Sequence, residues 1–348
     1  MGGKTGEVYD PTVNAWFLLP GAAIDPMLTY DHEGIFREDN HAWLYAWRDG
    51  SVFQAGPSKA MNWYYTDGQG SVSPAGVRDS VNDAMCGVNV MYDIGKIFSA
   101  GGSQYYDEAP GLNVAHLISI DQVGAPAVVE QLPNMKYARA FANVVVLPDG
   151  KILITGGQGY AKGFTDREPI FAPELFDPAT KTFTELASEA IPRNYHSVSI
   201  LLADGTVFSG GGGLCYDDGT GTPSQRCHDT VDHPNGQIFT PPYLTTGAPR
   251  PLINSLTSVT TRPGGELRVT ISGSAEGVTF ALIRIGSVTH NVNTDQRRIP
   301  LVLETTNGSE IGLRLPSDSG VVLPGAWYLF AVSAQGVPSV ARTVYVQL

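Results

Sequence analysis

The chain has 348 residues, a net charge of −12 and only 16% charged residues, of which Lys and Arg together number 22. It contains no block of about five or more basic residues. Nucleic acids and anionic membranes both need a positive face, so they are excluded as expected partners. No apolar stretch of about 18 residues occurs, which excludes a transmembrane helix.

The length predicts two domains, or one large repeat domain with an appendage. The 40 glycines favour short strands joined by tight turns. The first residues lack an apolar core, so we expect no signal peptide in this chain. Among the three cysteines, Cys215 and Cys227 lie in one loop-like stretch. The count alone leaves open a disulfide between them and three reduced thiols.

Recurring hairpins are the strongest internal signal. An outer hairpin is predicted over residues 8–18 and another over residues 175–186. Inner hairpins are predicted over residues 42–56, 88–102, 144–157 and 199–213. Most of their turns are Asp-Gly, which favours a hairpin because glycine tolerates positive φ. The turn glycines recur about every 50 residues: Gly50, Gly95, Gly150 and Gly205.

This repeat predicts an all-β fold whose residues 1–244 form a partial kelch-type β-propeller. Four inner hairpins and one additional outer hairpin correspond to about four and a half blades, so we expect an incomplete ring. An ordinary β-sandwich with coincidental Asp-Gly turns is the alternative. The unpaired sheet edges of an open ring predict oligomers or aggregation.

The sequence pattern changes after residue 244. Residues 247–251 are rich in Pro and Gly and are predicted to form a linker. Residues 245–348 are predicted to form an immunoglobulin-like β-sandwich without the Cys and Trp pattern of antibody domains. The predicted strands cover residues 267–271, 279–285, 299–303, 311–315, 327–333 and 341–346.

Two sites in the sequence carry side chains suited to chemistry. Tyr195 and His196 stand at the start of a predicted inner strand, and inner strands line the channel of a propeller. His290 stands in a polar loop between two sandwich strands. Each could also be an ordinary surface or structural residue.

Taken together, these motifs resemble the galactose oxidase family of copper radical oxidases. The resemblance runs from residue 6 to residue 348 and corresponds to the back half of the family's chain. It is carried by residues 39–43, 56–57, 60–65, 83–87, 193–197, 204–205, 210–215 and 289–300.

By position, the resemblance implies that Tyr195, His196 and His290 are ligands of one copper ion. Tyr195 would also take the proton of the substrate hydroxyl. Imidazole and phenolate are both suitable donors for Cu(II). The implied substrate contacts are Arg37, Phe141, Phe164, Tyr106 and Asp107, and Asp107 departs from the galactose oxidase pattern. Arg37 favours a sugar because its planar fork of donors suits a vicinal diol.

The resemblance also implies a Cys215–Cys227 disulfide and a secreted parent enzyme. The implied reaction oxidises a primary alcohol, as in galactose, to an aldehyde while O2 is reduced to H2O2. Glyoxal or simple alcohols are the alternative substrates. The family's second redox centre is a tyrosyl radical on a tyrosine cross-linked to cysteine. Both residues lie upstream of the segment that matches residues 6–9, so we expect the chain as written to be inactive.

Three interpretations remain open at this stage. The chain is a fragment of a secreted copper radical oxidase, a short non-catalytic module that binds carbohydrate or protein, or a half-ring that closes by association with another chain.

Overall fold

The computed structural model describes residues 5–31, 41–213, 231–273 and 275–348. Regular structure in these residues is almost entirely β. The described helical elements are single 3-10 turns, η1 (Asp25–Met27), η2 (Arg48–Gly50) and η4 (Pro242–Leu244). None of the helices in the described part of the chain could cross a membrane. The predicted all-β class is confirmed.

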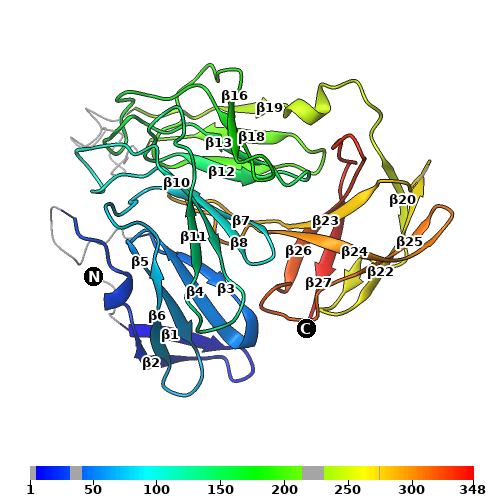
Figure 1. Cartoon of the computed structure of the whole chain (residues 1–348), viewed down its shortest axis with the longest axis horizontal. Coiled ribbons are helices and arrows are strands. Elements are labelled where there is room, and N and C mark those ends of the chain that lie inside the picture. The colour runs from blue at the N-terminus through cyan, green and yellow to red at the C-terminus, as the bar shows by residue number, and fades with distance from the viewer. Residues whose placement is uncertain (1–4, 32–40, 214–230, 274) are drawn as a thin grey trace, which may run out of the picture.

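The N-terminal two-thirds of the chain form a series of small antiparallel sheets, which follow one another from blue to green in Figure 1. The first is the hairpin of β1 (Thr5–Asp10) and β2 (Ala15–Ala23). Three four-stranded sheets come next. The first contains β3 (Trp43–Ala46), β4 (Ser51–Gly56), β5 (Ala60–Tyr65) and β6 (Ser71–Val77), and the second contains β7 (Val88–Asp93), β8 (Lys96–Ala100), β10 (Ala115–Ser119) and β11 (Val128–Gln131). The third contains β12 (Asn143–Val146), β13 (Ile152–Thr155), β15 (Glu174–Asp177) and β16 (Thr182–Glu185). The last is β17 (Ser197–Leu201), β18 (Val207–Gly211) and β19 (Gly236–Phe239). A short pair, β9 (Ala109–Pro110) and β14 (Tyr160–Ala161), links two of the four-stranded sheets.

This order confirms the predicted inner hairpins, β3–β4, β7–β8, β12–β13 and β17–β18, and the predicted outer hairpin β1–β2. The turn glycines Gly50, Gly95, Gly150 and Gly205 have φ of 67°, 66°, 87° and 85°, the left-handed region in which glycine has no Cβ penalty. The four sheets that begin with β3, β7, β12 and β17 are blades, and the first strand of each lies at its inner edge. Inner strand β12 contacts both β7 and β17, so the first strands of successive blades lie side by side.

Strands β12 and β13 are buried on both faces. All four residues of β12 and all four of β13 are buried. A strand covered on both faces is recognised by a continuous apolar run rather than by alternation, which is the pattern of residues 144–147 and 152–154.

The C-terminal part of the chain is a sandwich with the strand order β20-β22-β25-β24-β23-β26-β27-β21, drawn in yellow to red in Figure 1. Strand β24 (Arg298–Asn307) joins its two layers: residues 298–301 pair with β23 (Thr279–Arg284), and residues 302–307 pair with β25 (Glu310–Arg314) across a bulge. All six predicted strands are present. The additional strands are β20 (Leu252–Leu256) and β21 (Thr260–Thr261); the rest are β22 (Glu266–Ser272), β26 (Gly325–Val332) and β27 (Arg342–Val346).

Propeller blade and sandwich share one hydrophobic core. Trp43 and Trp47 of the first blade belong to the same buried cluster as Trp327 and Leu329 of the sandwich. Gly320 shows how closely the two parts approach, because a Cβ added there would lie 2.0 Å from the carbonyl oxygen of Trp47. This shared core holds the sandwich against the inner ends of the blades.

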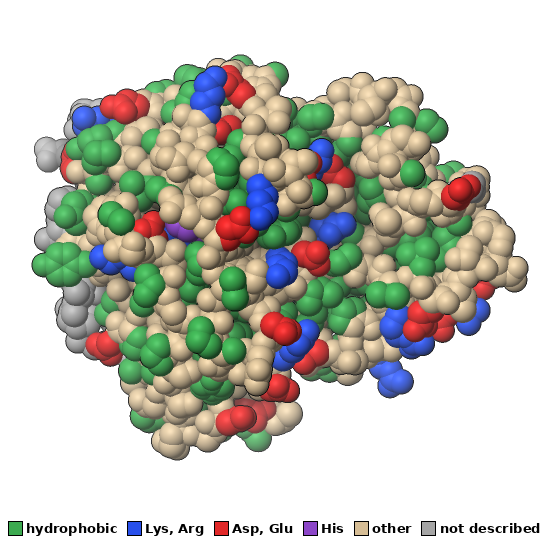
Figure 2. Space-filling view, viewed as in Figure 1, with side chains coloured by type: hydrophobic (Ala, Val, Ile, Leu, Met, Phe, Trp, Pro, Cys, Tyr) green, Lys and Arg blue, Asp and Glu red, His purple; other side chains and the backbone are tan. Residues whose placement is uncertain are grey.

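The surface of the face shown in Figure 2 carries Lys and Arg side chains next to Asp and Glu, and the basic side chains do not gather into one patch.

Candidate metal centre

Tyr195 and His196 lie immediately before β17, at the inner edge of its blade. Tyr195 is 1% exposed, and His196 is half-buried. His196 has φ of 71°, the left-handed region that side chains other than glycine rarely adopt. This turn changes the strict alternation of a strand, so both rings reach the same side of the chain.

His290 arrives from the sandwich. It lies on the exposed loop between β23 and β24, and its φ of 54° is also left-handed. The Oγ1 of Thr289 lies 2.7 Å from its Nδ1, a hydrogen bond that orients the ring. Backbone conformations of this kind cost about 1–3 kcal/mol each and are found more often at functional sites than elsewhere.

The structure brings these three rings together. Ring centroids of Tyr195 and His196 are 4.3 Å apart, those of His196 and His290 4.7 Å, and those of Tyr195 and His290 5.8 Å. Donor atoms of a shared metal ion each lie about 2 Å from it. The three rings are therefore close enough to fit around one ion.

A set of three metal ligands at this cluster must include the phenol oxygen of Tyr195. Within the described residues, no group of three or more His, Cys, Asp or Glu side chains is arranged to hold a metal ion. Two imidazoles and a phenolate are nitrogen and oxygen donors of the kind that Cu(II) accepts. The chemistry of these residues therefore fits copper.

A third histidine belongs to the same cluster. His41, just before β3, has its ring 4.9 Å from that of His290 and 6.4 Å from that of Tyr195. Burial, together with the neighbouring His290 and His196, lowers the pKa of His41 to about 4. The ring is thus neutral near pH 7. His41 belongs to the family motif of residues 39–43, but its sequence context does not predict a place beside His290.

Aromatic side chains surround Tyr195 on its other sides. The ring centroids of Phe141, Phe164 and Tyr106 lie 4.7, 5.1 and 5.8 Å from that of Tyr195. Phe164 also contacts the ring of His196 at 5.1 Å and is partly exposed, whereas Phe141 is 0% exposed. Phe141 and Phe164 both have left-handed φ, at 58° and 62°.

Asp107 and Asp166 hold the loop that carries Phe164. The Oδ1 of Asp107 accepts a hydrogen bond of 3.0 Å from the backbone N of Gly163. The Oδ1 of Asp166 accepts one of 2.9 Å from the Nδ2 of Asn194, next to Tyr195, and lies 2.9 Å from the Nε2 of His233. Asp107 is predicted from the sequence, whereas Asp166 and His233 are not, because their pairing joins distant segments of the chain. Arg37, Cys215 and Cys227 lie outside the described residues.

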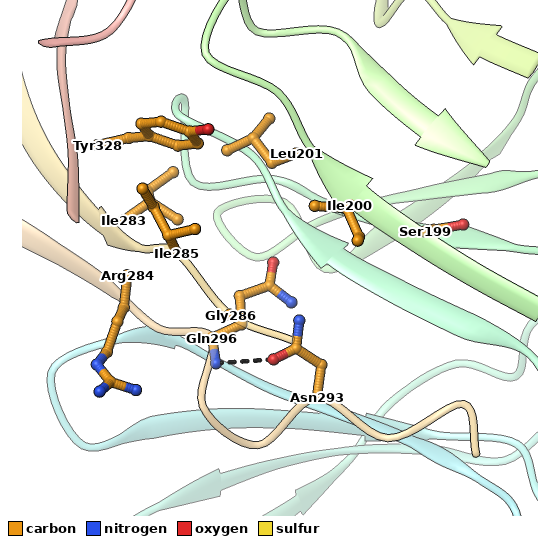
Figure 3. Close-up of a pocket in the computed structure, with 10 residues that line it drawn as sticks. All are labelled: Ser199, Ile200, Leu201, Ile283, Arg284, Ile285, Gly286, Asn293, Gln296 and Tyr328. Atoms are coloured by element: carbon orange, nitrogen blue, oxygen red, sulfur yellow. Dashed lines mark hydrogen bonds between the residues drawn. The ribbon is translucent and has the colours of Figure 1, made fainter. Parts of the chain in front are cut away.

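A small cavity of about 20 Å³ lies between β17 and the base of the His290 loop. Figure 3 shows Asn293 and Gln296 of this loop beside Ile200 and Leu201, with the Oδ1 of Asn293 accepting from the backbone N of Gln296 at 3.1 Å. This cavity is at the domain junction rather than at the ring cluster, and it is too small for a substrate.

Comparisons with known proteins agree with the fold. Residues 250–346 match the family described as galactose oxidase-like, early set domain, and residues 108–216 match the glyoxal oxidase N-terminus family. A galactose oxidase of Gibberella zeae is 48% identical over 99% of this chain, and an Arabidopsis thaliana aldehyde oxidase is 30% identical over 61% of it. The chain covers 50% of the former and 36% of the latter, and it spans about half the length of the Gibberella zeae relatives it matches.

A solved structure extends the similarity to three dimensions. It is that of a fungal alcohol oxidase of the AA5 family in complex with copper, with a TM-score of 0.91 and 44% sequence identity. The match covers 100% of this chain and 71% of that one. The chain therefore belongs to the galactose oxidase family of copper radical oxidases.

Proposed function

We propose that this chain carries the copper-binding part of an alcohol oxidase, with Tyr195, His196 and His290 as the copper ligands. The observation that carries the proposal is the convergence of these three rings, from the propeller and the sandwich, within 5.8 Å of one another. Relatives named galactose oxidase and a related alcohol oxidase in complex with copper support the choice of metal and reaction.

The proposed reaction converts a primary alcohol and O2 into an aldehyde and H2O2. Bound copper would accept one of the two electrons that the alcohol loses on oxidation. Tyr195, as the phenolate, would accept the proton of the substrate hydroxyl and become the phenol; its ring contacts the rings of both histidines. His41, neutral because of its lowered pKa, can donate or accept a hydrogen bond at the substrate without adding positive charge to the site.

The substrate would lie on the open side of the cluster. Phe164 is partly exposed and contacts His196, so its face can meet the apolar face of a sugar. Phe141 is buried against the ring of Tyr195 and would keep that ring in place. Asp107 would hold the loop that carries Phe164. With Tyr106 and Arg37, these residues favour a galactose-type alcohol; glyoxal and simple alcohols are the alternative substrates.

The second electron equivalent requires another redox centre, which the family provides as a cross-linked tyrosine and cysteine. The resemblance to the family gives that role to no residue of this chain. We therefore expect this chain alone to bind copper and to release no peroxide from galactose. The proposal also includes secretion of the parent enzyme and a disulfide between Cys215 and Cys227. It places the domain boundary at 244/245 and includes self-association of the chain through the open edges of its blades.

The test is titration of the purified chain with Cu(II), followed by optical and electron paramagnetic resonance spectra. We expect one ion per chain and a phenolate-to-copper charge-transfer band. Tyr195→Phe should remove the band, while Tyr345→Phe, an exposed tyrosine of the sandwich, should leave it intact. A chain that binds no stoichiometric copper, or a band that persists in Tyr195→Phe, would contradict the proposal and favour a non-catalytic binding module.

A further inference from the structure

The segment that follows His290 touches the first strand of every inner hairpin. We call residues 291–297 the axial segment. Arg297 donates from Nη1 to the carbonyl oxygen of Ala46 in β3 at 3.1 Å, and its backbone forms a bridge with Met91 in β7. Gln296 bonds to β12, and Asn291 bonds to the start of β17. The axial segment is therefore fastened to the inner edges of four blades in turn.

The two amide side chains of the axial segment act at different blades. Gln296 completes the free edge of β12: its Oε1 accepts from the N of Val146 at 2.7 Å, and its Nε2 donates to the carbonyl oxygen of Val144 at 3.2 Å. No proposed copper ligand lies on β12. Asn291, in contrast, bonds directly to the backbone that carries His196.

Asn291 makes three hydrogen bonds with two consecutive residues. Its Oδ1 accepts from the backbone N of His196 at 3.3 Å, and its Nδ2 donates to the carbonyl oxygen and to the Oγ of Ser197, both at 3.2 Å. The Oγ of Ser197 also accepts from the Nδ2 of Asn143 at 2.9 Å. Asn291 is 3% exposed, so water does not compete for these bonds.

The backbone of Asn291 is consistent with this role. His290 and Asn291 have φ of 54° and 63°, and asparagine tolerates the left-handed region better than most residues. The side chain of Asn291 turns to the propeller, while the ring of the preceding His290 meets those of Tyr195 and His196. One residue thus links two backbone segments that each present a ring to the cluster.

We propose that Asn291 is the positioning residue that fixes His290 relative to His196. Without its three bonds, the exposed His290 loop would keep its distant anchors at Gln296 and Arg297 but would lose its direct link to the backbone of His196. The role of Asn291 toward copper rests on the proposed function, whereas its link to the His196 backbone does not.

The first measurement needs no metal. Hydrogen exchange of the His196 amide should become about fivefold faster in Asn291→Ala, the change expected for one lost hydrogen bond. Gln296→Ala is the matched control, because it removes an amide of the same segment at another blade; exchange of the His196 amide should stay within about twofold. Asn291→Asp retains an acceptor for the His196 amide and should retain its protection. Unchanged exchange in Asn291→Ala would overturn the proposal.

The second measurement is the dissociation constant for Cu(II). We expect Asn291→Ala to bind Cu(II) at least about tenfold more weakly than the unmodified chain, the usual effect of removing a residue that orients a ligand. Gln296→Ala should lose less affinity. If Asn291→Ala does not fold, Asn291→Gly provides the test, because glycine adopts the left-handed φ of residue 291 without strain and makes none of the three side-chain bonds, so it should weaken copper binding.

The outcomes separate the two proposals. Equal copper affinity in the unmodified chain and in Asn291→Ala would overturn the positioning role alone. No copper binding by the unmodified chain would overturn the proposed function, and the positioning role toward the metal with it, while the exchange data would still decide whether Asn291 holds the His196 backbone.

Discussion

Arg139 and Glu174 form a buried ion pair, with an Nη2–Oε2 distance of 2.9 Å and side chains that are 0% and 1% exposed. The pair is fully hydrogen-bonded at its periphery: Arg139 donates to the carbonyl oxygen of Gly156 at 2.8 Å, and Glu174 accepts from the backbone N of Lys136 at 2.7 Å. It joins the segment before β12 to β15 within one blade.

We expect Glu174→Ala to lower the free energy of unfolding by about 3–5 kcal/mol, because Arg139 is then left as an uncompensated buried charge. Urea denaturation measures this change. Glu185→Ala is the control, since Glu185 pairs with Lys136 at the surface and its loss should change stability little. A small effect of Glu174→Ala would mean that water reaches the guanidinium.

His116 predicts a pH dependence of stability. Burial, and then the positive charge of Arg78, lower the pKa of His116 to about 4, although the carboxylate of Asp79 opposes the shift. The unfolded chain binds a proton near pH 6.5, so the contribution of neutral His116 is complete above that pH and is lost as the pH falls toward 4. The loss reaches about 3 kcal/mol.

The measurement is the free energy of unfolding between pH 4 and pH 7.5. In His116→Gln, stability should fall less steeply with decreasing pH than in the unmodified chain. Identical slopes would show that His116 already gains its proton in the folded state.

The β1–β2 hairpin exposes a row of large apolar side chains. Trp16, Phe17 and Leu18 of β2 are 68%, 49% and 62% exposed. Apolar side chains grouped in this way favour self-association. We expect the chain to form concentration-dependent oligomers, and Trp16→Glu to shift it toward monomer in analytical ultracentrifugation. Val302→Glu, at an exposed apolar residue of the sandwich, should not; a purely monomeric unmodified chain would refute the prediction.

The hairpins were predictable from the sequence because their determinants are local. Gly150 follows Asp149 in a turn that requires positive φ, and the flanking runs of residues 144–147 and 152–154 are apolar throughout. Strand β21 was not predictable, since Thr260 and Thr261 gain their strand character only from a parallel partner in β27. The same holds for the change of layers along β24, which depends on two different partner strands.

Residues of the candidate site could be predicted from the sequence only where they match a motif of the family. Tyr195, His196 and His290 carry the family pattern, and the structure brings them together. Asn291 and Gln296 looked like ordinary polar loop residues, because their partners lie 95 and 150 residues away in the chain. His41 likewise acquires its place only when the first blade and the sandwich meet.

The axial segment also determines at which point of folding the cluster of Tyr195, His196 and His290 can form. Arg297 and Ala46, which it joins, are separated by 251 positions, and closing so long a span costs entropy that only the finished contacts return. The ring cluster cannot assemble on the propeller alone or on the sandwich alone. Binding of one metal ion by all three proposed ligands should accordingly require that the two parts have already docked.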